Sequence, residues 1–335
     1  MARSHLTLAA LATSAVDGLD AQSASRFGTG TGSDFDSALV TGTDGRHWIV
    51  RVPGSERAEA EQSADLQALR ALSQGIRTRL PFSVSSYAGQ APVDNTRAVV
   101  YEFVYGTKLS LAGLRPDGLA ASVGRAIAAI HLLPTSFVAD AGLPVLAPHD
   151  VLRSTVTIMD RASATNLVPT TLLGRWEKAA EDSALWQFAP TTINGELTAE
   201  SFLHADGEVS GVLGWHGLSV GDPARDLCWL LGSSDEAVID TAIDAYTLVR
   251  GGTDRQLSKR ARLYAELEIA KWLLHGTQER NTEIVDDAVR MLHGLVDRVD
   301  GNLEANISHN TMPVMTVDEV ESMLDERERG AASAE

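Results

Sequence analysis

The chain has 335 residues, 44% of them hydrophobic, and its 45 acidic and 28 basic side chains give a formal net charge of -17. That length and apolar content can fill the core of one large or two modest domains. The acidic balance argues against nucleic acid or an anionic membrane as a partner, and it is compatible with a cationic small-molecule substrate. No apolar run approaches the roughly 18 residues of a membrane-spanning helix, and the single cysteine, Cys228, excludes an internal disulfide. Both features favour a cytoplasmic protein.

The first third of the chain has the pattern of a small α+β lobe. Apolar residues at helical spacing near the N-terminus favour an ordinary helix over a signal peptide. A glycine-rich stretch at 28–32 precedes two short strands at 37–40 and 47–52, which a turn at 44–45 separates. Glycines before a strand can let backbone amides approach a phosphate, but a flexible connector explains the same composition.

A clear helix is expected next, over 55–76, because its leucines recur on one face. Two further strands, at 82–87 and 97–104, frame a turn near 94–95. Strand patterns dominate before Gly106 and helical patterns after it, so Gly106 is a natural boundary between two lobes.

The remainder of the chain is mainly helical. The apolar spacing predicts helices at 116–131, 149–162, 168–182, 235–250, 257–278 and 282–298. His131, at the end of the first of these, is better explained as a structural residue than as a functional one. We therefore expect an N-terminal lobe at 1–105, a helical lobe at 106–300, and a tail at 301–335 with a short helix at 317–328.

One hairpin stands out within the helical part. The segment 201–213 alternates apolar and polar residues around Asp206-Gly207, a pair typical of a tight turn. Its second strand would bring residue 214 beside the loop that begins at residue 194. Asp222 and Pro223 then have the N-cap and first-turn pattern of a helix start.

The loop Asn194-Gly195-Glu196 and the run Gly221-Asp222-Pro223-Ala224-Arg225-Asp226-Leu227 together resemble the signature of the aminoglycoside and macrolide phosphotransferase family. These small-molecule kinases have a protein-kinase-like fold. The family reads His-Gly-Asp at the loop start, Asn five residues after that Asp, an Asp closing a short strand, and Gly-Asp-Pro-x-x-Asp-Leu. The altered positions are Asn194 for the His, Glu196 for the catalytic Asp, Ser201 for the Asn and Gly214 for the metal-binding Asp.

The resemblance implies a catalytic group with a degenerate metal site. Glu196 keeps a carboxylate that can act as base, one methylene further out, with Asn194 beside it. Ser201 is a weak candidate ligand for Mg²⁺, and Gly214 supplies none, so Mg²⁺ binding is doubtful. We expect structural roles for two further residues. Asp222 is the predicted N-cap of the following helix, and Asp226 is expected to hold the catalytic loop through backbone contacts.

The resemblance also implies a site for ATP or GTP in the N-terminal lobe. Arg51, on the strand at 47–52, matches the basic residue that reaches the nucleotide phosphates, although an exposed strand arginine is an equal alternative. Glu61 is its expected partner and Asp65 the rival. The segment from Glu102 through Val104 resembles the hinge that receives adenine through backbone groups. These two hinge residues complete the expected nucleotide site.

The fold expected from these features is α+β and two-lobed, with a small sheet-based N-lobe of five strands and a larger, mainly helical C-lobe. The function implied is transfer of a nucleotide γ-phosphate to a hydroxyl of a macrolide-like or aminoglycoside-like molecule, with weakened activity. The alternative is a pseudokinase that binds a nucleotide or small ligand without catalysis. Gly214 favours the alternative and Glu196 favours the enzyme. Acidic residues that could meet a cationic antibiotic are Asp160, Glu177, Glu181 and Asp182, although a solvated helix face explains them equally well.

Overall fold

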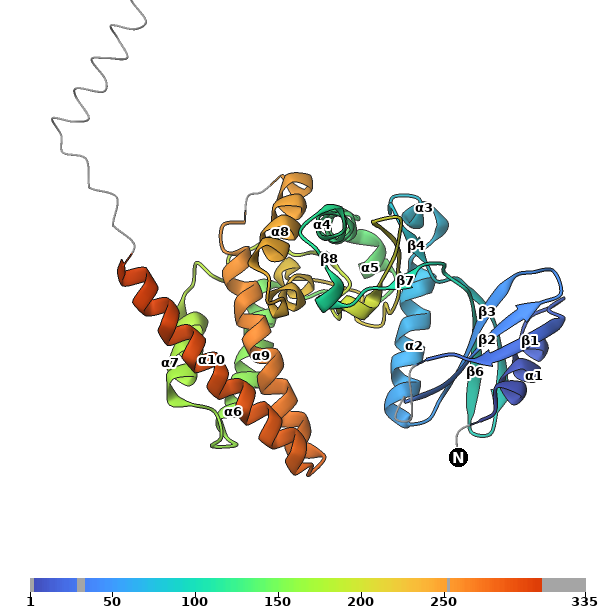
Figure 1. The fold of residues 1–335 in the computed structure, drawn as a ribbon, viewed down its shortest axis with the longest axis horizontal. Coiled ribbons are helices and arrows are strands. Elements are labelled where there is room, and N and C mark those ends of the chain that lie inside the picture. Colours follow the sequence, from blue (N-terminus) through green and yellow to red (C-terminus); the bar gives the residue numbers. More distant parts are fainter. Residues whose placement is uncertain (1–2, 29–33, 252–253, 309–335) are drawn as a thin grey trace, which may run out of the picture.

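The computed structural model describes residues 3–28, 34–251 and 254–308, with side chains described as far as Arg298. It has two lobes, a small one built on a sheet and a larger helical one (Figure 1). This arrangement confirms the predicted two-lobed α+β fold.

The small lobe contains a five-stranded antiparallel sheet in the order β1-β2-β3-β6-β5. The helix α1 (His5–Ala15) packs on one face, where Leu8 and Ala12 meet Val50 and Val52 in a separate small core. The strands are β1 (Ala21–Arg26), β2 (Phe35–Gly42), β3 (His47–Pro53), β5 (Tyr87–Val93) and β6 (Thr96–Glu102).

The long helix of the small lobe differs from the expectation. It divides into α2 (Glu56–Ala71) and α3 (Gln74–Arg77). The break is stabilised by the Arg77 side chain, whose guanidinium donates to the carbonyl oxygens of Leu72, at 2.6 Å, and Leu69, at 3.1 Å. A sequence pattern cannot reveal such a contact, because the helical spacing continues through the break.

Two strand assignments were also incomplete. The expected strand at 82–87 is β4 (Ser83–Val84), which pairs in parallel with β10 (Glu208–Val212) of the large lobe. The sheet strand β5 begins only at Tyr87. The edge strand β1 was not located because its residues are polar and mostly exposed, so it lacks an apolar alternation.

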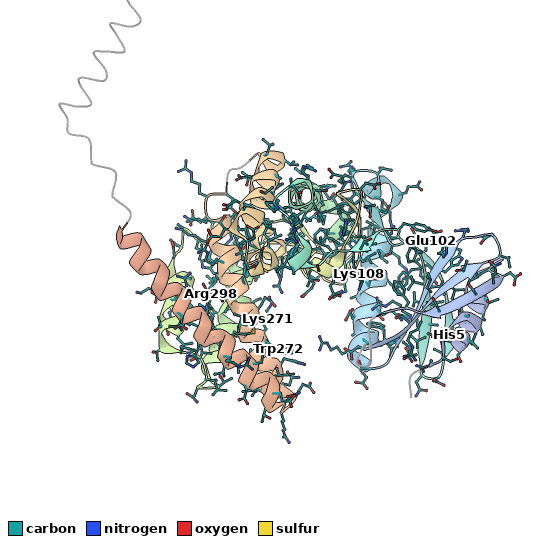
Figure 2. All side chains as sticks on the ribbon, viewed as in Figure 1. His5, Glu102, Lys108, Lys271, Trp272 and Arg298 are labelled. Atoms are coloured by element: carbon teal, nitrogen blue, oxygen red, sulfur yellow. The ribbon has the colours of Figure 1, made fainter. Side chains whose placement is uncertain are left out.

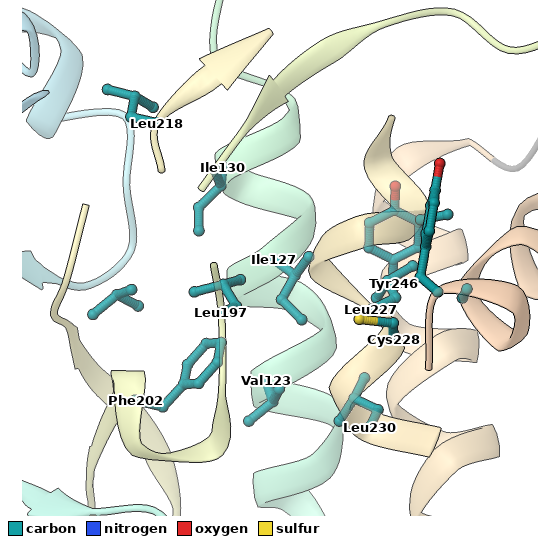
Figure 3. Close-up of a cluster of buried hydrophobic side chains, with 14 of the residues drawn as sticks. Val123, Ile127, Ile130, Leu197, Phe202, Leu218, Leu227, Cys228, Leu230 and Tyr246 are labelled. Carbon is teal, nitrogen blue, oxygen red and sulfur yellow. The ribbon is translucent and has the colours of Figure 1, made fainter. Parts of the chain in front are cut away.

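The large lobe packs its helices around α4 (Gly118–His131). Val123, Ile127 and Ile130 of α4 are fully buried in the main core (Figure 3). Gly124 allows α4 to approach α8 closely, because a Cβ there would lie 2.9 Å from the carbonyl carbon of Ala242. The other helices are α5 (Ser136–Asp140), α6 (Pro148–Ser163), α7 (Thr170–Glu181), α8 (Glu236–Arg250), α9 (Leu257–Gln278) and α10 (Thr282–Ser308), with short 3-10 turns η1 (Leu111–Gly113) and η2 (Ala199–Ser201).

Short strands frame the loop of interest. The hairpin β9 (Phe202–Ala205) and β10 (Glu208–Val212) turns at Asp206 and Gly207, both at positive φ, as the Asp-Gly pair predicts. It belongs to a sheet in the order β4-β10-β9-β7, and a second small sheet pairs β8 with β11. The remaining strands are β7 (Thr107–Lys108), β8 (Thr191–Ile193) and β11 (Ser219–Gly221).

Three further differences concern helices. The expected helix after Asp222 consists of two 3-10 turns, η3 (Pro223–Asp226) and η4 (Cys228–Gly232). The helix α10 continues past residue 300 to Ser308, and the helix expected at 317–328 lies outside the described residues. In the described parts of the chain, no helix combines the length and apolar character needed to cross a membrane.

Candidate active site

Asp226 holds the loop that begins at Asn194. Its side chain is fully buried, and its two oxygens accept hydrogen bonds from the backbone N–H groups of Asn194 and Gly195, both at 2.7 Å. His131 Nε2 lies 3.1 Å from the same carboxylate, and His131 Nδ1 lies 2.9 Å from the Tyr246 hydroxyl. Burial raises the pKa of Tyr246 to about 12, so this hydroxyl stays neutral beside His131. The Asp226 carboxylate therefore fixes the start of the loop at Asn194 and Gly195.

Asn194 links the loop to residue 214. Its side chain is buried; Nδ2 donates to the Gly214 carbonyl at 2.8 Å, and Oδ1 accepts from the Glu196 N–H at 3.2 Å. Because both ends of the amide are engaged, Asn194 is a positioning residue in this geometry. The sequence pattern had grouped it with the catalytic residues.

Glu196 is the exposed acid of this loop. Its carboxylate is 52% exposed and lies 3.6 Å from the guanidinium of Arg225, whose Nε donates to the Gly195 carbonyl at 3.0 Å. Glu196 and Arg225 line two cavities, one of about 1350 Å³ and one of about 230 Å³. A base at this position can meet a hydroxyl group presented from either cavity.

The residues present do not fit a bound Mg²⁺ ion. Gly214 has no side chain, and a Cβ built there meets only open space. The Ser201 hydroxyl accepts from the Thr198 N–H at 3.1 Å, so it is committed to the loop. The described residues contain no group of three or more His, Cys, Asp or Glu side chains that could hold a metal ion. Mg²⁺ prefers several hard oxygen ligands in octahedral geometry, and this position offers no carboxylate.

Asp65, rather than Glu61, connects the small lobe to this region. The Trp215 N–H donates to Asp65 Oδ1 at 2.7 Å, which brings α2 next to residue 214. Burial raises the pKa of the Asp65 carboxyl, and the Trp215 N–H and the charge of Arg51 offset only part of that effect. Among the described ion pairs, none joins Arg51 to Glu61, and the Arg51 guanidinium lies 3.8 Å from the centre of the Phe35 ring. The choice of Glu61 is therefore not supported by the geometry, because Asp65 is the carboxylate on the inner face of α2.

Aromatic side chains gather at the expected hinge. Phe27, His47, Phe103 and Tyr105 form a chain of ring contacts with centroids 4.9–6.2 Å apart. Tyr105 is 62% exposed, and its hydroxyl lies 2.8 Å from His47 Nδ1. Such rings can stack against a planar base.

The two hinge residues chosen from the sequence differ in their contacts. The Glu102 side chain is directed to Arg46, at 2.9 Å, and its backbone N–H donates to the Ser86 carbonyl. The Val104 N–H has no hydrogen-bond partner among the described residues, so it remains free to donate to a ligand.

Asp222 has a structural role. Its carboxylate accepts from Arg260 Nε at 2.7 Å and from the Tyr264 hydroxyl at 2.7 Å, and all three side chains are buried. Burial alone would lower the pKa of Arg260, but Asp254 and Asp222 together raise it above its ordinary value. This network ties the start of η3 to α9. Nothing in the local sequence identifies Arg260 or Tyr264 as the partners, since they lie in an ordinary helical pattern 38 and 42 residues away.

The larger cavity lies in the helical lobe. One face of α9 and one face of α10 contribute to it, and Figure 2 labels Trp272 of α9 and Arg298 of α10 among its lining residues. Its apolar lining is formed by Leu197, Cys228, Trp229, Leu231, Ile239, Ala265, Ile269, Trp272, Met291 and Leu295. Burial raises the pKa of the Cys228 thiol to about 12, so this cysteine is an apolar and unreactive wall residue.

The acidic side chains expected to meet a cationic substrate lie elsewhere. The four carboxylates at 160, 177, 181 and 182 are exposed on α6 and α7 or just after α7, and none lines either cavity. The charged lining of the larger cavity is instead Arg175, Arg225, Arg262, Arg298, Glu196, Glu236, Glu266 and Glu268. The net charge of the chain is therefore a poor guide to the charge of its cavity.

Comparisons with known proteins identify the family and the fold of this chain. The model of the phosphotransferase enzyme family matches residues 28–264, which is most of the chain. The chain belongs to this family. An uncharacterized protein of Bacillus subtilis (strain 168), YcbJ, is 23% identical over 277 residues, covering 77% of this chain and 88% of its own.

Solved structures show the same fold. The macrolide 2'-phosphotransferase MphH from Brachybacterium faecium superposes with a TM-score of 0.68 at 22% identity, over 82% of this chain and 94% of that one. A macrolide 2'-phosphotransferase type I gives 0.70 at 24% identity, over 86% and 96% of the two chains. The GDP and kanamycin complex of APH(2")-IIIa gives 0.71 at 18% identity, over 86% and 98%.

Proposed function

We propose that this protein is a small-molecule phosphotransferase that transfers the terminal phosphate of ATP or GTP to a hydroxyl group, with weakened activity. The observation that carries the proposal is the position of Glu196, an exposed carboxylate on a clamped loop that opens on two cavities. The names of the structural relatives suggest a macrolide or an aminoglycoside as the first substrates to test.

Each residue has a distinct task in this proposal. Glu196 orients the substrate hydroxyl and accepts its proton, while Arg225, 3.6 Å away, must release or share that carboxylate. Asp226 and Asn194 hold the loop in place. A bound nucleotide would supply the phosphoryl group; Arg51 and the free Val104 N–H are the residues that would hold its phosphates and its base, beside the aromatic rings of the hinge.

A second candidate function, that of a pseudokinase, is favoured by one specific observation. The position of the metal-binding carboxylate is Gly214, and the described residues offer no replacement cluster. Phosphoryl transfer depends on charge stabilisation at the transferred group, which a metal ion normally supplies. The expected phosphoryl transfer is therefore slow. A protein that transfers no phosphate would still bind ligands in the same cavities.

Nucleotide binding and transfer can be tested separately. Thermal shift with ATP and with GTP, each with and without Mg²⁺, measures binding, and we expect stabilisation that depends little on Mg²⁺. Transfer is then measured with radiolabelled nucleotide, a macrolide and kanamycin, in the wild type, Glu196→Gln, and the control Glu200→Gln. Glu200 is 77% exposed in the same loop.

The outcomes distinguish a phosphotransferase from a pseudokinase. Transfer that Glu196→Gln abolishes and Glu200→Gln retains supports the enzyme. Nucleotide binding without transfer supports the pseudokinase. If no nucleotide stabilises the protein, both nucleotide-dependent readings fail.

A further inference from the structure

Two arginines in the walls of the larger cavity form no ion pair among the described residues. Arg262 of α9 and Arg298 of α10 line the cavity, both are exposed, and neither has an ion-pair or hydrogen-bond partner among the described side chains. Among the other charged lining groups, Glu236 also forms no described ion pair, and the remaining groups are engaged. Glu196 is near Arg225, and Glu268 is paired with Lys271.

The two arginines lie at the same level of an antiparallel helix pair. The close approach of the pair is at Gly276, where a Cβ would lie 2.7 Å from Ile284 Cγ2. Arg262 is fourteen residues before Gly276, and Arg298 is fourteen residues after Ile284. With an equal rise per residue in both helices, the two guanidinium groups extend from matching turns. In Figure 1, α9 and α10 separate with distance from their shared turn, so these residues lie where the pair is open.

A third arginine is near the same end. Arg175 Nε lies 3.0 Å from the carboxylate of Glu266, which is one helical turn after Arg262 on α9. Glu266 is nearly fully buried and also accepts from Trp176 Nε1 at 3.0 Å. Arg175 and Trp176 therefore bind the carboxylate of Glu266, which forms no described ion pair with Arg262 or Arg298.

The cavity floor between the helices is apolar. Keeping the same register, Ala265 faces Leu295 and Ile269 faces Met291, and Trp272 follows at the closed end, where its Nε1 donates to Asp287 at 3.1 Å. A ligand that fills this space meets aliphatic and aromatic side chains first and guanidinium groups at the open end.

We infer that the substrate of this cavity is an amphipathic hydroxyl compound with an anionic group such as a carboxylate, and not a polycation. The apolar body would pack on the α9–α10 floor, and the anionic group would be bound by Arg262 and Arg298. This inference rests on the proposed function in assigning the cavity to the substrate. It differs from the cationic substrate that the net charge of -17 had suggested.

The test is a binding measurement without nucleotide or Mg²⁺, so it does not depend on phosphoryl transfer. The probes are cholate, a hydroxylated amphipathic carboxylate, its uncharged methyl ester, and the polycation kanamycin, each titrated by calorimetry. The variants are Arg262→Gln, Arg298→Gln and the double variant. Lys259→Gln is the matched control, because Lys259 is exposed on α9 and lines neither cavity.

We expect the wild type to bind cholate more tightly than the methyl ester, and kanamycin least. The double variant should bind cholate about threefold to tenfold more weakly, the range for two exposed ion pairs, with little change for the ester. Added salt should weaken the binding of cholate to the wild type more than to the double variant. Lys259→Gln should behave as the wild type.

Three results would overturn the inference: equal affinity for cholate and its ester, a preference for cholate that survives in the double variant, or tighter binding of kanamycin than of cholate. Absence of binding by either steroid up to about 2 mM would also overturn it. Arginine-dependent cholate binding in a protein without any transfer would leave this inference standing while the proposed enzyme fails.

Discussion

Among single residues, two of the four altered positions, Glu196 and Gly214, have different consequences. Glu196 keeps the chemical group that its position requires, and the loop geometry around it is intact. Gly214 removes a carboxylate, and no neighbouring side chain moves into its place, since a Cβ there would meet open space. The backbone at residue 214 has φ +72, a conformation that Asp and Asn adopt more readily than other side chains.

Gly214→Asp should therefore fit and restore a metal ligand. We expect nucleotide binding to become Mg²⁺-dependent, with affinity rising about tenfold when Mg²⁺ is added, the equivalent of roughly 1.4 kcal/mol. Calorimetry with ATP or GTP checks this. Gly214→Ala carries the same backbone strain without the carboxylate and should show no such dependence; an equal Mg²⁺ effect in both variants would contradict the assignment.

Asp65 gives a prediction about pH. A carboxyl whose pKa is raised in the folded state stabilises the fold below its unfolded pKa, and this contribution is lost as pH rises through the folded pKa. Asp65→Asn keeps an oxygen that can accept from Trp215 and removes the cost of the buried charge. We expect a Tm higher by roughly 1–2 °C at pH 7 and no gain at pH 4, measured by calorimetry. A lower Tm at pH 7 would show that the attraction of Arg51 outweighs burial.

At the scale of elements, the loop is clamped by groups from three separate segments. Asp226 of η3 receives backbone N–H groups from the loop, and His131 at the end of α4 supports the same carboxylate. Tyr246 of α8 supports His131 in turn. Elements far apart in the chain therefore determine where Glu196 lies.

Asp226→Asn should loosen this clamp. An amide offers one accepting oxygen where the carboxylate offers two, and its NH2 group would face an N–H donor. We expect a loss of about 2–3 kcal/mol in the free energy of unfolding, measured by urea titration. Asp240→Asn, at an exposed position of α8, is the control and should change it by less than about 0.5 kcal/mol. If Asp226→Asn also changes the free energy of unfolding by less than about 0.5 kcal/mol, Asp226 does not hold the loop in place.

For the molecule as a whole, Gly106 lies in the connection that leads from β6 to β7. This residue has φ +148, and a Cβ there would lie 2.9 Å from Leu203 Cβ and even closer to the Ser210 hydroxyl. The Ser210 hydroxyl donates to the Tyr105 carbonyl at 3.0 Å, which fixes the connection against the hairpin β9–β10. The path of the connection therefore requires a glycine.

Gly106→Ala should destabilise the protein by about 1–3 kcal/mol, because it adds both a steric overlap and an unfavourable backbone conformation. Gly75→Ala is the control: its φ is ordinary and no atom lies within 4 Å of the added carbon. Urea unfolding of both variants checks the difference. Equal stability of the two variants would show that the connection can adjust without cost.

Local sequence patterns were enough to predict the order and type of most elements. The apolar spacing predicted α6, α7, α8 and α9 to within two residues, and the Asp-Gly pair predicted the β9–β10 hairpin. The runs around Glu196 and Asp226 predicted the family, which the match over 28–264 confirms. These features are local, since backbone conformation and apolar periodicity are set by neighbouring residues.

Which charged groups meet depends instead on packing between distant segments of the chain. Glu61 and Asp65 are one turn apart on α2, and the sequence cannot tell which of them faces Trp215. Arg262 and Arg298 are ordinary charges of amphipathic helices until the α9–α10 register places them at one level of the cavity. Periodicity predicts which face of a helix is buried, but the partner of that face is set by packing between segments distant in the chain. The charge of the cavity therefore depends on contacts that no local pattern records.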